Sequence, residues 1–155
     1  SALLPELKKQ KMSWKSCVCF YFEVDQTNIP NKTIALISDA GNYANNLYAY
    51  KDVSTGKTIL SVTSLKQSEQ SDQEMIDAII QEVKTYAGSS QVTYIKHFNI
   101  SQALPDLQDI QMTVKPKQNQ ALEHVFLAGD YLLNGSLNAA MESGRLAAKA
   151  LHERK

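Results

Sequence analysis

The chain has 155 residues, of which 43% are apolar and 21% charged, and its 16 basic residues balance its 16 acidic ones. This length and composition suit a folded module with a substantial core, and the neutral balance removes the electrostatic case for nucleic-acid binding. No apolar stretch of the sequence is long enough to span a bilayer, so we expect a cytoplasmic or membrane-peripheral location.

The first part of the chain contains four segments of strand character. Apolar, β-branched and aromatic residues are concentrated in these segments, and turn-forming residues separate them. The predicted strands cover 17–24, 32–38, 46–50 and 57–65. Cys17 and Cys19 project from the same face of the first strand, where an ordinary disulfide is disfavoured, so we expect two buried or half-buried thiols.

A capping box predicts a helix after these strands. Ser71 and Glu74 have the spacing at which each satisfies a backbone donor of the other, and Gly88 is the expected stop. The apolar side chains on one face of this helix are Ile76, Ile79, Ile80 and Val83. A strand over 92–98 and a loop beginning at 103–105 follow. These elements predict an α+β fold with a mixed, largely antiparallel sheet and one helix packed on it.

The histidines and cysteines give no metal-ligand pattern. His97, His124 and His152 are scattered over different predicted environments, and a Cys-x-Cys pair without further cysteines is a weak signal. We interpret His97, on the strand over 92–98, as a packed or surface side chain. No metal site is expected, and no Ser-His-Asp order or paired acid motif identifies a catalytic acid or base.

The end of the chain has the pattern of a strand, a turn and a helix. Residues 125–128 form an apolar run of strand length, and Gly129 permits a sharp exit from that strand. Asp130 then places a carboxylate at the strand's carboxyl end, which is where ligands bind in α/β sheets. A loop over 131–134 follows.

A helix is predicted to begin at Gly135 and Ser136, with Ser136 or Asn134 as its cap. The start of a helix presents backbone donors and the positive end of its dipole, which suit a phosphate, a carbonyl oxygen or a developing anion. One face of this helix holds Leu137, Ala140, Met141, Gly144, Ala147, Ala148 and Leu151. Small residues let that face lie close to a sheet or to a large flat ligand. An ordinary strand-to-helix connection with a solvated cap is the alternative interpretation.

The segment 125–148 resembles the carboxyl-terminal flavin motif of the FAD-dependent amine oxidase superfamily, which includes phytoene desaturases, protoporphyrinogen oxidases and monoamine oxidases. The matching residues are Ala128-Gly129-Asp130, Gly135-Ser136, Ala140, Ser143-Gly144 and Ala147-Ala148. Ala139 stands where the family usually has glycine, and it would crowd the backbone beside the flavin ring. Ser136 stands where monoamine oxidases have a tyrosine, so the motif is more similar to that of the desaturases and protoporphyrinogen oxidases.

This resemblance implies a set of FAD contacts. Asp130 would hydrogen-bond the ribityl part of FAD, and the backbone from Ser136 to Asn138 would approach the flavin ring. The Leu137 N–H would stabilise negative charge at the flavin N1 and C2 carbonyl. The implied cofactor residues are Gly129, Asp130, Gly135, Ser136, Leu137 and Asn138.

The pyrophosphate-binding motif of these flavoenzymes is absent from the sequence. The glycines are Gly41, Gly56, Gly88, Gly129, Gly135 and Gly144, and no two have the spacing of a Gly-x-Gly-x-x-Gly run. We therefore expect a carboxyl-terminal fragment of a longer enzyme. Residues 1–120 would form a β-rich region like the family's substrate domain, and 121–155 would be the last strand, turn and helix of an absent dinucleotide-binding domain.

The expected function is that of an FAD-dependent oxidoreductase that removes hydride from a C–C or C–N bond of a small, lipophilic substrate. Its expected partner is the missing N-terminal FAD-binding domain, without which the chain would be inactive and would bind FAD poorly. An exposed edge on the strand at 125 would favour a homodimer of the fragment. The alternative is a non-catalytic α+β binding or assembly module, for which tolerance of a bulky residue at 139 is the expected discriminator.

Overall fold

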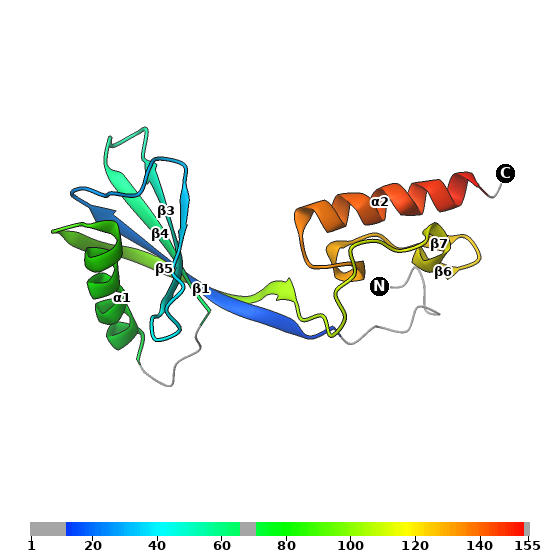
Figure 1. The fold of residues 1–155 in the computed structure, drawn as a ribbon, viewed down its shortest axis with the longest axis horizontal. Helices are drawn as coiled ribbons and strands as arrows, with labels where there is room; N and C mark the ends of the chain where they lie inside the picture. Colours follow the sequence, from blue (N-terminus) through cyan, green and yellow to red (C-terminus); the bar gives the residue numbers. More distant parts are fainter. Residues whose placement is uncertain (1–11, 66–70, 154–155) are drawn as a thin grey trace. The chain divides into compact units, whose positions relative to one another are not determined.

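The structure, a computed structural model, describes residues 12–65 and 71–153 (Figure 1). The chain divides into two compact units, which we call the sheet unit (16–101) and the C-terminal unit (1–15 with 102–155). In chain order the elements are β1 (Trp14–Val24), β2 (Ile34–Leu36), β3 (Ala44–Lys51), β4 (Thr58–Ser64), α1 (Asp72–Ala87), β5 (Val92–Pro105), η1 (Pro116–Asn119), β6 (Gln120–Leu122), β7 (Val125–Phe126), η2 (Asp130–Leu132) and α2 (Leu137–His152).

The main sheet has five strands in the order β2-β3-β4-β1-β5. The pairs β1/β4, β3/β4 and β2/β3 are antiparallel, with Phe22 opposite Leu60 and Leu60 opposite Ala49. The predicted α+β fold with a largely antiparallel sheet and a packed helix is confirmed. All four strands expected before the helix are present.

The core of the sheet unit lies between the sheet and α1. Strict alternation along β1 buries Phe20, Phe22 and Val24 on the helix side, and Cys19 and Tyr21 lie on the opposite face. The helix contributes Met75, Ile76, Ile79, Val83 and Ala87 to this core, and Ile80 packs against it in part. The apolar face predicted for the helix is therefore the one that packs against the sheet.

Both ends of α1 follow from local side-chain chemistry. The Ser71 hydroxyl accepts the Glu74 N–H at 3.4 Å, and the Ser71 N–H donates to the Glu74 carboxylate at 2.9 Å. This reciprocal pair is the predicted capping box. Gly88 ends the helix in the left-handed conformation, with a φ of 67°, which costs glycine little.

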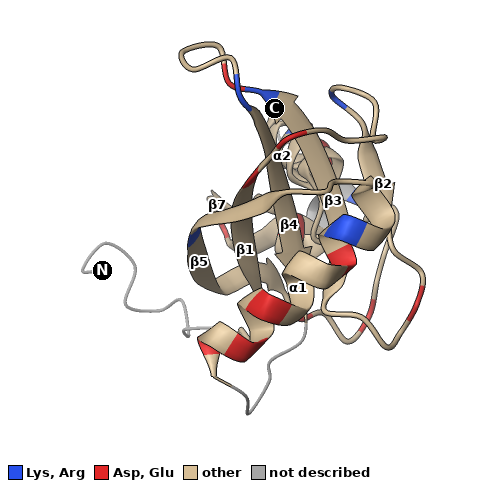
Figure 2. Cartoon of the chain, turned by 90° about the vertical axis from the view of Figure 1, so that its left-hand side faces the viewer, with Lys and Arg blue, Asp and Glu red and all other residues tan. Residues whose placement is uncertain are grey.

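Helix α1 is mainly acidic (Figure 2). Its charged residues are Asp72, Glu74, Asp77, Glu82 and Lys84. The Glu82 carboxylate reaches the loop before β3, where it accepts the N–H groups of Tyr43 at 2.8 Å and Ala44 at 2.7 Å. This helix therefore fixes the β2–β3 connection as well as covering the sheet.

The C-terminal unit contains the β6/β7 hairpin, two short 3-10 helices and α2. Strands β6 and β7 are antiparallel, with a register shift between Gln120 and Leu122. No described helix of either unit is long and apolar enough to cross a membrane. The boundary expected at residue 120 concerns the domains of a longer protein and stays a prediction.

Three local predictions are wrong at their boundaries. The segment 103–105 continues β5 instead of beginning a loop, and Pro105 is tolerated there because β5 is an edge strand and Pro105 is its last residue. The run 125–128 forms only the two-residue strand β7, because its partner β6 is itself three residues long. The loop expected over 131–134 contains most of η2.

Candidate functional site

Gly129 lies in the turn after β7, where an added side chain would require the Tyr131 ring to move. A Cβ placed there would lie 2.4 Å and 2.6 Å from two ring carbons of Tyr131. The Tyr131 ring is partly buried, and this burial raises the pKa of its hydroxyl. The chain bends at Gly129, after the end of β7, and the close approach of the tyrosine ring explains why glycine suits this position.

Asp130 organises the turn through its backbone. Its carbonyl oxygen accepts the N–H of Leu133 at 3.0 Å and the N–H of Gly135 at 3.1 Å. Asp130 is half-buried, and within 12–65 and 71–153 its carboxylate meets no hydrogen-bond donor or cation. This acidic side chain is therefore available to a ligand hydroxyl or amide.

Gly135 and Ser136 start α2. Gly135 has a φ of 67°, a left-handed conformation that favours glycine. The Ser136 hydroxyl accepts the Ala139 N–H at 3.1 Å and donates to the Asn134 side-chain oxygen at 2.6 Å. Ser136 is thus the helix cap, and its hydroxyl already acts as both donor and acceptor.

The first turn of α2 leaves backbone donors open. The N–H groups of Leu137 and Asn138 precede the first intrahelical hydrogen bonds, and no acceptor in the described part of the chain meets them. Leu137 is 77% exposed. Together with the half-buried Asp130 carboxylate, these donors give the C-terminal unit one acidic group and one helix start that can meet polar groups of a ligand.

A polar network ties the turn to α2. The Gly129 N–H donates to the Ser143 hydroxyl at 2.8 Å, and that hydroxyl donates to the Ala140 carbonyl oxygen at 2.9 Å. The buried Asn119 side chain donates to the Ser143 carbonyl oxygen at 2.9 Å. Sequence reasoning assigned no role to Asn119 or to the Ser143 side chain. The sequence feature that could have indicated the role of Ser143 is its position on the same helix face as Ala139, Leu146 and Ala150.

The face predicted for close packing of α2 is not the buried one. The buried residues are Ala139, Ser143, Leu146 and Ala150. The predicted face instead carries exposed side chains, with Met141 68% and Leu151 57% exposed. The two stripes adjoin on the helix, and Ala140, Gly144 and Ala147 of the predicted one are half-buried. The uncovered stripe is an apolar surface that suits a further contact.

Ala139 does not have the role expected for it. Its side chain is 3% exposed and lies inside the C-terminal unit. The expected crowding of a ligand by this residue is therefore wrong, since its Cβ faces the unit's own core. A bulky residue at this position would overpack that core in a flavoenzyme and in a binding module alike, so it does not discriminate between them.

His97 is a packed side chain in the sheet unit. Its ring lies 5.3 Å from the Phe20 ring, and its Nδ1 is 2.8 Å from the Tyr94 hydroxyl. The Asp72 carboxylate is 3.7 Å from its Nε2. Among the described residues, no group of three His, Cys, Asp or Glu side chains is placed to hold a metal ion. Cys17 and Cys19 are both free thiols.

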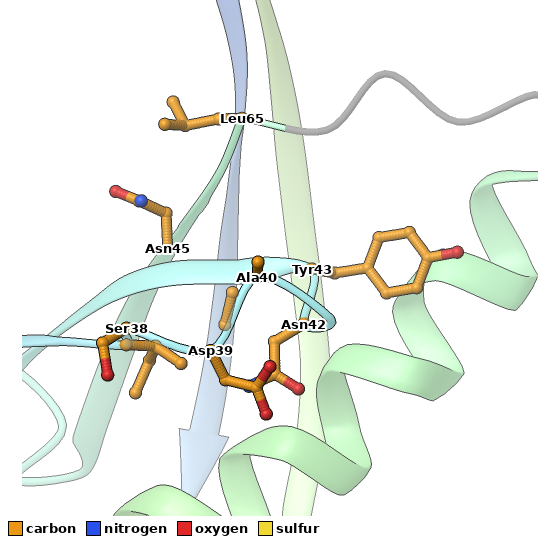
Figure 3. Close-up of a pocket in the computed structure, with 9 residues that line it drawn as sticks. Ser38, Asp39, Ala40, Asn42, Tyr43, Asn45 and Leu65 are labelled. Carbon is orange, nitrogen blue, oxygen red and sulfur yellow. The ribbon is translucent and has the colours of Figure 1, made fainter.

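A hollow of about 220 Å³ lies beside the β2–β3 connection (Figure 3). The Tyr43 ring points toward α1, and Asp39 and Asn42 lie together at the turn. The Asp39 carboxylate accepts the Gly41 N–H at 2.9 Å, and the Asn42 amide donates to the Tyr86 hydroxyl at 2.6 Å. These polar groups already form hydrogen bonds within the chain. We therefore interpret the hollow as part of the contact between the β2–β3 turn and α1, and not as a ligand site.

The fold and the site together define a class of protein. It is an α+β protein whose carboxyl-terminal unit has a short strand, a turn at Gly129 and a capped helix with open backbone N–H groups at Leu137 and Asn138. A model of the family described as flavin containing amine oxidoreductase matches residues 3–152. The chain therefore belongs to the flavin-containing amine oxidoreductase family. No curated protein matches the sequence. FAD is the cofactor of this family in general.

Proposed function

We propose that this chain supplies the carboxyl-terminal, flavin-facing part of an FAD-dependent oxidoreductase of the desaturase and amine oxidase type. The reaction would remove hydride from a C–C or C–N bond of a small, lipophilic substrate. The observations that carry this proposal are the open N–H groups of Leu137 and Asn138 at the start of α2 and the half-buried Asp130 carboxylate in the turn that leads to it. FAD, when bound, supplies the isoalloxazine N5 as hydride acceptor.

The residues present fit one end of the cofactor. The Asp130 carboxylate would accept a hydroxyl of the ribityl chain, and the Leu137 and Asn138 N–H groups would donate to the C2 carbonyl side of the ring. The positive end of the α2 dipole adds to the stabilisation of negative charge at that position. Gly129 and Gly135 fix the turn that carries these groups, and the Ser136 hydroxyl orders the first turn of α2.

The remaining cofactor contacts would come from an N-terminal FAD-binding domain. The sequence has no Gly-x-Gly-x-x-Gly run to hold the pyrophosphate. The exposed apolar stripe of α2, with Met141 and Leu151, is where we place that domain, because covering it would remove the exposed apolar surface. We propose that the isolated chain is inactive. In the absence of the FAD-binding domain, a second copy of the chain would cover this stripe and form a homodimer.

A non-catalytic binding or assembly module of the same family is the second candidate. The extensive use of the turn's polar groups within the C-terminal unit supports it, since Ser136 and Ser143 act on the chain's own backbone. Such a module would keep the motif for packing, and the N–H groups of Leu137 and Asn138 would be solvated.

A proline substitution at the first helical position separates the two candidates. In the protein expressed with its native upstream coding region, Leu137→Pro removes one N–H but is compatible with helix geometry, because Pro is tolerated at this position. Ser136 has the extended backbone that a following proline requires, with a φ of -119° and a ψ of 161°. Leu137→Ala is the matched control, since it shortens the exposed side chain and keeps the N–H.

The flavin-facing role predicts that Leu137→Pro weakens FAD binding about tenfold, the effect of losing one hydrogen bond to a charge-bearing group, while Leu137→Ala changes it little. A packing role predicts equal FAD binding, or equal absence of it, in both variants. Circular dichroism of both proteins would verify that α2 is retained.

A further inference from the structure

The face of the main sheet that α1 does not cover carries a second hollow, of about 390 Å³, a size within the range of small-molecule sites. Its floor is Ile59 of β4. Tyr50 of β3 is paired with Ile59 and forms one wall, and Tyr21 of β1 stands on the other side with Phe98 of β5. Short β4 side chains between larger aromatic ones therefore make a groove along that strand.

The walls of this groove are held by aromatic contacts. The Tyr21 and Phe98 rings meet edge to face, with centroids 6.0 Å apart and an interplanar angle of 85°. Tyr50 stacks on Tyr48 at 6.0 Å with an angle of 27°. Phe98 and Ile95 are nevertheless 49% and 45% exposed. Aromatic walls with partly exposed faces favour a flat, apolar ligand that stacks between them.

The charges at the rim distinguish an anionic ligand from a cationic one. The Lys96 ammonium lies 4.9 Å from the centroid of the Phe98 ring, and no carboxylate among the described residues pairs with it. Asp52, on the other side of the rim, is already occupied by its own turn. Its carboxylate accepts the Ser54 N–H at 3.2 Å, the Ser54 hydroxyl at 3.0 Å and the Thr55 hydroxyl at 2.6 Å.

We propose that this hollow binds a small molecule with a flat, apolar body and a carboxylate group. The body would lie over Ile59 between Tyr50 and Phe98, and the carboxylate would meet the Lys96 ammonium. A ligand ammonium at the same position would be repelled by Lys96, and the Asp52 carboxylate on the other side of the rim already accepts donors of its own turn. This site goes beyond the proposed function, because all its residues belong to the sheet unit and it requires neither flavin nor a further domain.

The test is a pair of calorimetric titrations of the full chain without flavin. Naphthoate is the probe, and naphthylmethylammonium is its matched control, with the same ring system and the opposite charge. We expect naphthoate to bind about threefold to tenfold more tightly than the ammonium, the range of a partly exposed ion pair plus the removal of a repulsion. Tighter binding of the ammonium, or no binding of either probe, would overturn the proposal.

Three variants locate the binding. Lys96→Gln keeps most of the side-chain stem and should weaken naphthoate about threefold to fivefold without weakening the ammonium. Lys84→Gln, on the exposed side of α1, is the charge-matched control and should leave both affinities unchanged. Phe98→Ala removes an aromatic wall and should weaken both probes about fivefold. Equal effects of the two lysine variants would indicate general electrostatic attraction and contradict the site.

A second copy of this chain is the competing occupant of the same face. In that case sedimentation would show a dimer that Phe98→Ala dissociates, and naphthoate would not bind at saturating protein concentration. This result would also overturn the proposal. Neither result depends on whether the protein carries flavin, so failure here is distinguishable from failure of the proposed function.

Discussion

The Gly129 N–H donates a 2.8 Å hydrogen bond to the Ser143 hydroxyl, which joins the turn after β7 to the middle of α2. Ser143 is fully buried, and its hydroxyl passes a further hydrogen bond to the Ala140 carbonyl oxygen. The orientation of the Gly129–Asp130 turn against the helix therefore depends on one fully buried side chain.

Replacing that hydroxyl should loosen the turn. Ser143→Ala leaves the Gly129 N–H without its acceptor, and we expect a loss of about 1–2 kcal/mol in the free energy of unfolding. Ala148→Ser is the matched control, since it makes the reverse change at an exposed position of the same helix and should cost only about 0.5 kcal/mol. Urea denaturation followed by circular dichroism measures both. Equal effects of the two variants would show that the hydrogen bond does not hold the turn.

The cap of α2 gives a second prediction, in which one substitution should lower stability and a second one at the same position should restore it. Ser136→Ala removes the acceptor of the Ala139 N–H and should destabilise the C-terminal unit by about 1 kcal/mol. Ser136→Asp should keep most of the stability, because a carboxylate caps a helix equally well and favours the positive end of its dipole. Helical content during thermal unfolding is the readout. A Ser136→Asp variant as unstable as Ser136→Ala would contradict the capping role.

Local side-chain chemistry made α1 predictable, whereas contacts distant in sequence decide the shape of the C-terminal unit. Ser71 and Glu74 are three residues apart, so the sequence alone indicates their reciprocal hydrogen bonds. The hydrogen bond between Gly129 and Ser143 spans 14 residues, and the one from Asn119 to Ser143 spans 24. Small residues lie on several faces of α2, so helical periodicity could not select the stripe that Asn119 and Gly129 meet.

The groove over β4 was equally hidden from the sequence. Tyr21, Tyr50 and Ile59 lie on three strands, and only the register brings them together. Ile95, Lys96 and Phe98 all line the hollow, while His97 contacts Phe20 on the core side. Strict alternation along β5 would not place three of these four neighbours on one face, so a sequence pattern of period two fails at this strand.

Acid should destabilise the sheet unit through Asp25. The Ser90 hydroxyl, and then the Gln91 N–H, hold the pKa of this carboxyl below its usual range. A pKa lowered in the folded state gives stability that is present above the unfolded pKa of about 3.9 and is lost as the pH falls through the folded value. The urea midpoint of the wild type should therefore decrease below about pH 4.

Asp25→Asn removes this titration, so its urea midpoint should depend less on pH in that range. Ser90→Ala keeps the carboxyl and removes its first donor, and it should give an intermediate dependence. Identical slopes of the urea midpoint against pH in the wild type and Asp25→Asn would mean that other carboxyl groups control acid unfolding.

The thiols should react slowly. Burial raises the pKa of the Cys17 thiol, and the neighbouring Cys19 raises it further. Alkylation requires the thiolate, so iodoacetamide should modify Cys17 in the Cys19→Ser variant more slowly than it modifies glutathione at pH 8. The rate should rise as the pH increases toward the raised pKa. Faster modification than that of glutathione would show an activated thiol and contradict the structure.

The chain without a partner domain should bind FAD weakly. Its described residues offer the Asp130 carboxylate and the first turn of α2, but the sequence offers no glycine-rich loop for the pyrophosphate. A titration of FAD with the isolated chain, followed by flavin fluorescence, should show no stoichiometric end point. An end point at one FAD per chain would mean that these 155 residues suffice for the cofactor.

The most direct test of the flavin-facing role is the visible absorption spectrum of the protein purified from its native coding region, upstream sequence included. Our account predicts a preceding strand with Gly-x-Gly-x-x-Gly and one bound flavin per chain, lost or diminished in Leu137→Pro and retained in Leu137→Ala. A folded protein from that region with no flavin, even after incubation with excess FAD, would contradict the account and leave the non-catalytic module in its place.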